Sequence, residues 1–187
     1  EGAGIWEKGA MFRFFQVNRD IFLRTLCLVA VTLFFTSAGA SQGEIILAVN
    51  TLLMQLFTLF SYVMDGFAYA GEALSGRYIG ARNREAFTDT VRHLFGWGAV
   101  IAVLFTLVYA LGGNAFLGLL TDDKEVIAVA DTYFYWALAV PAVGIAAFIW
   151  DGIFIGATAT RGMLLSMAAA AVSFFILYYG LHPCLLY

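Results

Sequence analysis

Three carboxylic acids lie in or beside long apolar stretches of this 187-residue chain: Asp65, Glu72 and Asp151. An ionisable side chain at membrane depth costs about 2.5–3.5 kcal/mol, so it usually faces a bundle interior or a water-filled cavity and marks an ion or substrate route. Glu72 follows Asp65 by seven positions, about two helical turns, so a helix places both carboxylates on one face. We interpret the three acids as candidate ion-coupling residues. Glu72 can equally be a solvated interfacial acid that pairs with Arg77 or Arg82.

Two of these acids belong to stretches of similar sequence, VMDGFAYAGEALSGR and IWDGIFIGATATRG. Each stretch has Asp-Gly inside an apolar run, then small residues, then an arginine. GxxxG pairs, which allow two helices to approach closely, accompany both stretches: Gly152 and Gly156 lie within the second, whereas Gly76 lies in the first and its partner Gly80 follows just after it. Because transporters are often built from repeats with a site near the membrane midplane, the similarity favours a transport role for Asp65 and Asp151. The alternative is that both acids form interhelical hydrogen bonds that hold a bundle together.

The composition predicts the elements that position these acids. With 62% hydrophobic and 12% charged residues, the chain is far from the typical soluble domain, which is about 45–50% apolar and about 25% charged. We therefore expect an all-α integral membrane protein in the lipid bilayer, a polytopic bundle of five transmembrane helices. A spanning helix needs about 20 apolar residues, and the candidates lie near residues 20–38, 45–71, 94–112, 126–156 and 163–182.

Further features refine this picture. Pro141 predicts a bend within the fourth span. Residues 1–20 alternate aromatic and basic side chains, which is typical of an interfacial segment. No basic stripe or stacking platform of the kind that nucleic-acid binding needs is present, so nucleic acid is excluded as a partner.

Basic residues predict the orientation of the spans. Nine of the ten Lys and Arg residues fall on one side of the predicted spans, and the exception is Lys124 in TDDKEV. Because basic loops stay in the cytoplasm, the N-terminus is predicted inside and the C-terminus of this five-span chain outside. On the outer side, Asp122 and Glu125 predict the N-cap and third residue of the fourth helix.

Three stretches resemble the second half of multidrug and toxic compound extrusion (MATE) transporters, in particular the DinF-like bacterial branch: NRDIFLRTL, AVNTLLMQLFTLFSYVMDGFAYAGEALSGRYIGARN and AVPAVGIAAFIWDGIFIGATATRGM. The resemblance implies half of a two-lobed, twelve-helix fold. In that fold residues 1–20 are an inter-lobe segment and residues 21–187 are part of the C-terminal lobe. It also implies a bacterial cytoplasmic (inner) membrane location and export of amphipathic or cationic organic compounds by antiport with protons or sodium. The missing first lobe is then the implied partner, together with a small organic substrate.

The same resemblance bears on individual residues. Some members of the family have a cation site with an acid on the tenth helix, ten residues before an Arg-Gly pair, and Asp151 matches that position. Those members also have an acid on the seventh helix and a tyrosine four residues before the tenth-helix acid. Here residues 21–38 contain no acid and Ala147 stands at the tyrosine position. For the DinF-like branch the resemblance implies a proton-binding acid in the first lobe. The coupling ion stays open between H⁺ and Na⁺, and no metal site or organic cofactor is expected.

Aromatic residues near the acids are candidates for a substrate cleft: Tyr62, Phe67, Tyr69 and Trp136. An aromatic stripe at helical spacing is also what helix packing produces. Two other functions compete with transport. One is a structural or regulatory membrane module in which the acids only hold helices together. The other is an intramembrane aspartyl protease, in which two aspartates share a proton and activate water, although the YD and GxGD contexts of such proteases are absent and we do not expect an enzyme.

The charge distribution generates a test of topology. We expect residues 82–92 to be cytoplasmic and residues 114–125 to be outside. Single cysteines introduced at Asn83 and at Asp122 should then react differently with a membrane-impermeant thiol reagent applied to intact cells, with labelling at position 122 only. Labelling of position 83 from outside would contradict the prediction and indicate the opposite orientation.

Overall fold

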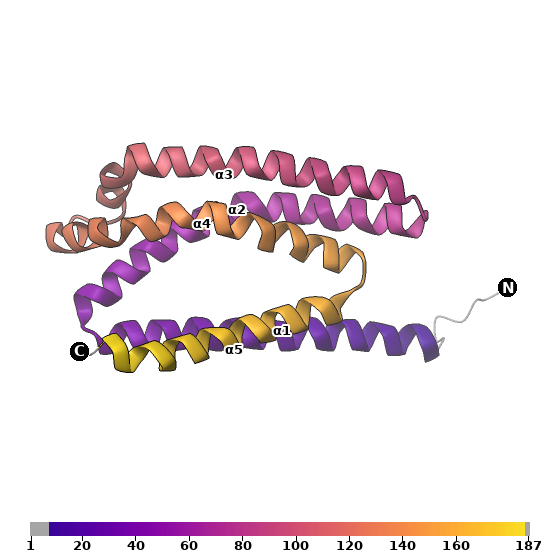
Figure 1. Ribbon diagram of the computed structural model, residues 1–187, viewed down its shortest axis with the longest axis horizontal. Helices are drawn as coiled ribbons and strands as arrows, with labels where there is room; N and C mark the ends of the chain where they lie inside the picture. The colour runs from indigo at the N-terminus through magenta and orange to yellow at the C-terminus, as the bar shows by residue number, and fades with distance from the viewer. Residues whose placement is uncertain (1–7, 186–187) are drawn as a thin grey trace. The chain divides into compact units, whose positions relative to one another are not determined.

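The computed structural model describes residues 8–185, and the side chains of all of these except Lys8, Ala10, Asn114 and residues 181–185. This part of the chain contains no strand and consists of five helices (Figure 1): α1 (Lys8–Ser41), α2 (Glu44–Gly80), α3 (Arg84–Leu120), α4 (Lys124–Gly156) and α5 (Thr160–Leu185). All five are long and apolar enough to cross a membrane. The all-α membrane bundle predicted from composition is therefore confirmed.

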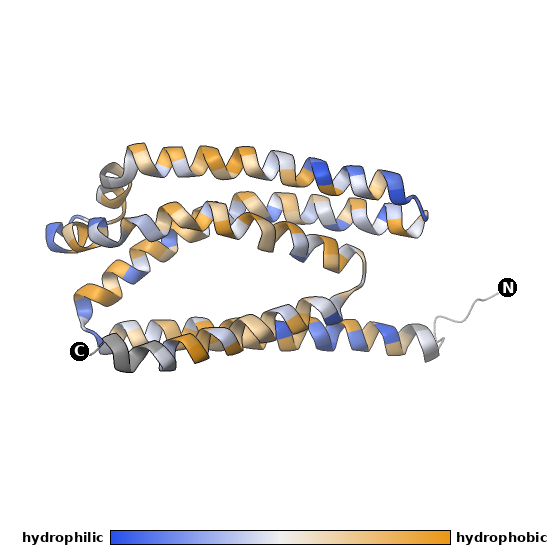
Figure 2. Ribbon diagram, viewed as in Figure 1, coloured by the Kyte–Doolittle hydropathy of each residue, from blue (hydrophilic) through white to orange (hydrophobic). Residues whose placement is uncertain are grey.

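The helices extend beyond the apolar runs that revealed them. α1 begins at Lys8 rather than near residue 20, and α3 begins at Arg84, so residues 84–93 form its first turns. An α-helix continues to satisfy its backbone hydrogen bonds where the sequence becomes polar, so hydropathy alone places the ends too far inward. Polar residues gather at the turn that joins α2 to α3, while apolar residues cover the middle of these helices (Figure 2).

The chain divides into two compact units. One contains α1 up to Phe35 together with α5, and the other contains residues Thr36–Ala157, which are the end of α1 and all of α2, α3 and α4. In the second unit α2 buries one face along its whole length, through residues three, four or seven positions apart: Val49, Leu52, Leu56, Phe60, Met64, Gly71 and Ser75. This spacing is that of one side of a helix, and the side faces α3 and α4.

Two apolar clusters fill the three-helix unit. The first joins the halves of the helices nearer the α3–α4 turn, around Leu56, Tyr109 and Phe134, and the second joins the halves nearer the α2–α3 turn, around Phe60 and Ile149. The hydroxyl of the buried Tyr109 donates a hydrogen bond of 2.7 Å to the carbonyl oxygen of Leu56. The one polar atom of this ring is therefore satisfied across the α2–α3 interface, as a tyrosine in an apolar surrounding requires.

The closest approach in this unit is between α2 and α4. A Cβ atom added to Gly152 would overlap the backbone carbonyl of Ala68, and one added to Gly156 would overlap that of Glu72. A Cβ on Gly76 would lie 3.2 Å from the carbonyl oxygen of Gly156. Backbone therefore lies against backbone at the crossing, which only residues without a side chain allow. The close approach predicted for the 152/156 pair is confirmed.

The glycines of the α2 stretch are packed differently from those of the α4 stretch. A Cβ atom added to Gly80 would have nothing within 4 Å, and the same is true of Gly66, which is the counterpart of Gly152 in the α2 stretch. The two related stretches thus do not use their glycines in the same way, since only the α4 copy needs both of its glycines for packing.

In the other unit α1 and α5 run side by side in the same direction (Figure 1). Asp20 contacts Thr160, and fourteen residues further along each helix the ring centroids of Phe34 and Phe174 lie 6.0 Å apart. The shared offset means that the two helices are parallel. Phe34 is the centre of an aromatic cluster that also contains Phe175, whose ring centroid is 5.0 Å away. Edge-to-face contacts of this kind stabilise helix pairs without polar groups.

The first turns of α3 and α4 are capped by side chains, whereas that of α2 follows a glycine. Gly43, before α2, has φ 113°, a conformation that favours glycine. The Asn83 side chain accepts a hydrogen bond from the backbone N–H of Ala86 at the start of α3. The N-cap of α4 is Asp123, which accepts from the N–H groups of Glu125 and Val126. The prediction of Asp122 was wrong by one position, because the residue with extended backbone directly before the helix is Asp123.

Pro141 lies inside α4 and is buried. Proline has no N–H, so the carbonyl four residues earlier lacks its helical partner and the helix bends away from that side. α4 is arched along its length (Figure 1), in agreement with the bend expected from the sequence.

The α2–α4 crossing generates a stability prediction. Gly152→Ala should lower the free energy of unfolding by about 3 kcal/mol or more, because the added methyl group overlaps backbone that cannot rotate away. Thermal unfolding of the purified protein in detergent measures the change. Gly66→Ala is the matched control and should be neutral or stabilising, since the space around it is open. Equal unfolding temperatures for the two variants would contradict the backbone contact.

A second prediction concerns Ser75, whose buried hydroxyl has no hydrogen-bond partner among the described residues. Ser75→Ala should leave stability unchanged or raise it by up to about 1 kcal/mol, because an unpaired buried polar group costs free energy. The same thermal measurement applies. A clear loss of stability would show that the hydroxyl has a partner, such as an ordered water.

Candidate functional site

The α2–α4 crossing brings the two acid-bearing stretches together. Gly152 packs on the backbone of Ala68, which lies three positions after Asp65 and four before Glu72. Asp151 directly precedes Gly152 on α4. The three acids predicted from the sequence therefore belong to a single helix crossing, although they are up to 86 positions apart in the chain.

The acids lie at the edge of the packed face of α2. Asp65 follows the buried Met64, and Glu72 follows the buried Gly71, so each carboxylate is rotated by about 100° from the buried side. All three acids are half-buried. An acid in this position is neither enclosed in apolar packing nor fully exposed.

The four aromatic candidates divide into two groups. Phe67 is half-buried and packs against the cluster of Phe60 and Ile149 inside the three-helix unit. Tyr62 and Tyr69 are 72% and 70% exposed, and their seven-residue spacing places them together on the opposite side of α2 from the buried face. Trp136 is 61% exposed on α4 and lies against Tyr135, with 5.1 Å between ring centroids. Tyr62, Tyr69 and Trp136 are thus exposed, whereas Phe67 contributes to packing.

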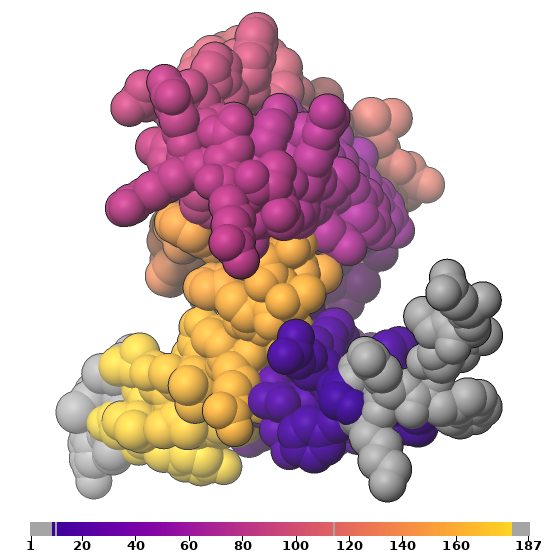
Figure 3. Space-filling view, turned by 90° about the vertical axis from the view of Figure 1, so that its right-hand side faces the viewer, coloured from indigo at the N-terminus to yellow at the C-terminus, as the bar shows by residue number. Residues whose placement is uncertain are grey.

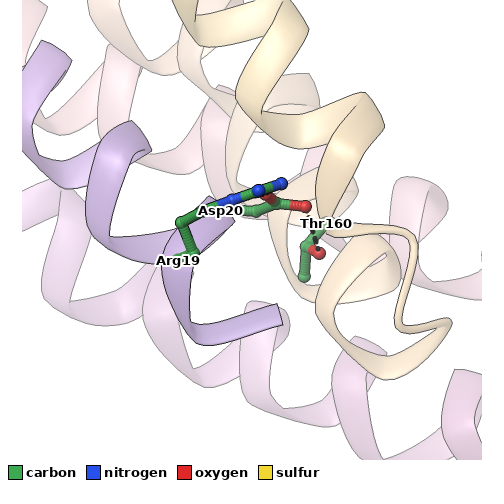
Figure 4. Close-up of polar contacts among 3 residues, drawn as sticks. All are labelled: Arg19, Asp20 and Thr160. Carbon is green, nitrogen blue, oxygen red and sulfur yellow. Dashed lines mark hydrogen bonds and ion pairs between the residues drawn. The ribbon is translucent and has the colours of Figure 1, made fainter. Parts of the chain in front are cut away.

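A further acid was not among the candidates from the sequence. Asp20 on α1 is 1% exposed, and it is the one buried charged residue among those whose side chains the structure describes. The hydroxyl of Thr160, the first residue of α5, donates to its Oδ2 at 3.2 Å (Figure 4). Arg19 donates to its Oδ1 from both Nε at 3.3 Å and a terminal nitrogen at 3.0 Å.

The α4–α5 turn presents Thr160 to this acid. Thr158 in that turn has φ 54°, a left-handed conformation that a β-branched residue seldom adopts. The backbone there is held in a costly geometry while Thr160 is buried at 3% exposure against Asp20. Polar residues thus join the first turns of the last helix to the first helix of the same unit.

The signal for Asp20 is present in the sequence but weak. It is an acid in a basic segment, next to Arg19, just before an apolar run, and that pattern usually indicates a solvated ion pair. Its burial depends on Thr160, 140 positions away. The part of the chain described here has no group of three or more His, Cys, Asp or Glu side chains that could hold a metal ion.

The comparisons with known proteins agree with the architecture. Residues 21–180 match the family described as MatE. This chain belongs to the MatE family. It is 41% identical over 167 residues to "DNA damage-inducible protein F" of Escherichia coli (strain K12), a match that covers 89% of this chain and 36% of that protein. The resemblance to the DinF-like branch is therefore confirmed.

Plant relatives are more distant. This chain is 26% identical over 133 residues to "Protein DETOXIFICATION 45, chloroplastic" of Arabidopsis thaliana, covering 71% of this chain and 24% of that protein. It is 22% identical over 149 residues to "Protein DETOXIFICATION 42" of the same plant, covering 78% of this chain and 29% of the relative. The chain spans about a third or less of the curated relatives it matches. No solved structure matches it.

The Asp20 contact generates a prediction for this MatE-family chain. Asp20→Ala should lower the free energy of unfolding by about 1–3 kcal/mol, because it leaves the buried Thr160 hydroxyl without its acceptor and removes the partner of Arg19. Asp20→Asn should cost less, since an amide oxygen still accepts from Thr160. Asp89→Asn is the control, because Asp89 is 55% exposed and lies 3.8 Å from Arg92. Thermal unfolding in detergent compares the three, and equal values for Asp20→Ala and Asp89→Asn would contradict a structural role for the buried acid.

Proposed function

We propose that the transporter containing this chain exports amphipathic or cationic organic compounds across the bacterial cytoplasmic membrane by antiport with H⁺ or Na⁺. The observation that carries the proposal is the grouping of Asp65, Glu72 and Asp151 at one helix crossing within candidate membrane spans. Membership of the MatE family supports the transport class, and the chain would contribute part of the second lobe. The first lobe is then the partner that completes the pathway.

The coupling step follows from the chemistry of the carboxylates. A half-buried acid binds a proton or a cation when it faces one side of the membrane and releases it when the surroundings change, so each cycle moves positive charge in one direction. The crossing ties α2 to α4 by backbone contact at Gly152 and Gly156, so these two helices move as one element. A change at any of the three acids would therefore be passed to both helices.

Substrate recognition would use the exposed rings of Tyr62 and Tyr69 on α2 and Trp136 on α4. Aromatic faces attract organic cations through the ring quadrupole and cover apolar bodies at little entropic cost. A ligand of this kind displaces water from rings that the three-helix unit does not itself bury. Phe67 would act indirectly, by packing beneath the segment that carries Asp65 and Glu72.

The proposed orientation has the N-terminus and the α2–α3 turn in the cytoplasm. The turn is basic, with Arg77, Arg82 and Arg84 within eight positions, whereas the α3–α4 turn holds Asp122, Asp123 and Lys124. Loops rich in lysine and arginine are retained in the cytoplasm during insertion. The coupling ion would accordingly enter from the side of the α3–α4 turn.

The test replaces each acid in the full-length transporter. Asp65→Asn and Asp151→Asn should each abolish most gradient-driven efflux, because asparagine keeps the size and hydrogen bonding but cannot exchange a proton. Glu72→Gln should be milder, since Glu72 lies two turns nearer the proposed cytoplasmic end of α2. Substrate efflux under an imposed proton or sodium gradient is measured alongside the amount of protein in the membrane.

Asp89→Asn is the control, because Asp89 is an exposed acid in the first turns of α3. If both asparagine variants export substrate at the rate of the unaltered protein and are present in the membrane in the same amount, the ion-coupling role is contradicted. It would favour the alternative of acids that only join helices in a structural or regulatory module.

A further inference from the structure

A groove lies between the beginning of α1 and the beginning of α5, within one unit of the structure. It has a volume of about 600 Å³. Figure 3 faces this end of the molecule, where the indigo residues of α1 lie beside the residues near position 160, drawn in orange. The side chains that carry the recognition chemistry of the groove are those of Arg13, Phe14, Gln16, Asp20 and Arg161.

The lining of the groove is positively charged. Arg13 comes from α1 and Arg161 from α5, and both are exposed. The acid in the lining is Asp20, whose oxygens already accept hydrogen bonds from Arg19 and Thr160. Two guanidinium groups from different helices therefore face a space in which the carboxylate is already paired. Guanidinium forks bind phosphate oxygens in pairs, with charge-assisted hydrogen bonds.

The groove also lies where the candidate membrane spans of both helices begin. The candidate span of α1 begins at Met11 and that of α5 at Thr160. Large apolar side chains are exposed at the same level of α1, with Phe12 71% and Phe14 64% accessible. Phe14 also forms part of the groove wall. Arginine and apolar side chains thus lie side by side in the groove, at the beginning of both candidate spans.

We propose that this groove binds an anionic phospholipid of the adjacent leaflet. Arg13 and Arg161 hold the headgroup phosphate, Gln16 offers an additional hydrogen bond, and an acyl chain lies against Phe14. A free inorganic anion would bind to the arginines but leave the apolar wall of the groove exposed to water. Arginines beside an apolar wall therefore fit a lipid better. A zwitterionic lipid places a positive ammonium next to the arginines and fits less well. The groove residues and the acids of the α2–α4 crossing belong to different units of the structure, and lipid binding in the groove does not depend on the proposed transport.

The experiment uses the full-length protein purified in a mild uncharged detergent and native mass spectrometry. Phosphatidylglycerol and phosphatidylcholine with the same acyl chains are added in turn at equal concentration. Each arginine near a membrane surface contributes about fivefold to the binding of an anionic lipid. We therefore expect tighter binding of phosphatidylglycerol than of phosphatidylcholine, with a loss of about fivefold in Arg13→Gln and again in Arg161→Gln. Equal retention of the two lipids by the unaltered protein would overturn the proposal, whether or not the variants fold.

Two further arms separate this site from general attraction and from a free anion. Arg84→Gln removes an exposed charge at the start of α3, outside the groove, and should keep the preference for phosphatidylglycerol. Phe14→Ser should weaken binding of the lipid. Inorganic phosphate at millimolar concentration should not displace it. A loss of preference in Arg84→Gln equal to that in Arg13→Gln, or displacement by inorganic phosphate alone, would each overturn the assignment.

Discussion

Contact between the backbones of α2 and α4 is the interaction on which the three-helix unit depends. In a lipid environment, apolar side chains gain nothing by leaving one apolar surrounding for another, so association rests on close van der Waals packing. Gly152 and Gly156 allow the backbone of α4 to lie directly on that of α2 at Ala68 and Glu72. The apolar clusters on either side, around Phe60 and around Leu56, can then close over the interface. A single methyl group added at the crossing would push the two helices apart.

The crossing also determines where charge is placed. Because Gly152 is in contact with Ala68, the adjoining Asp151 is carried to the segment of α2 that holds Asp65 and Glu72. These acids stay half-buried at the edge of the packed face. Asp20 in the other unit is treated differently, since it is enclosed and accepts hydrogen bonds from Thr160 and Arg19. A buried charge needs fixed hydrogen-bond partners, and Thr160 and Arg19 supply them to Asp20.

The similarity between α2 and α4 shows how far an internal repeat constrains a structure. The Asp-Gly pairs at 65–66 and 151–152 are equivalent in sequence, yet Gly152 lies in backbone contact whereas Gly66 faces open space. Two helices that cross once cannot both present the same position to each other unless the crossing is symmetric. Related segments therefore share an acid within a candidate membrane span without sharing the packing around it.

The sequence by itself determined the membrane class, the number of helices and the acids of the candidate site. These follow from local properties: apolar runs long enough to span a bilayer, and charges too costly to be there without a reason. The family was readable from motifs such as DGFAYAGEALSGR, and Pro141 marked a bend in its helix. The N-cap at Asp123 was missed by one residue because its backbone conformation, rather than its residue type, distinguishes it from Asp122.

Only the tertiary structure decided which of these features meet. Asp20 accepts a hydrogen bond from Thr160, 140 positions away, and its neighbours in the sequence do not distinguish it from a solvated acid next to an arginine. The division of the aromatic candidates, with Phe67 packed and Tyr62 and Tyr69 outward, depends on which side of α2 faces its neighbours. Hydrophobicity does not reveal that side in a membrane helix, because lipid-facing and core-facing positions are equally apolar. Contacts between distant segments are set by the shape of the packed helices, and that shape comes into being only when they associate.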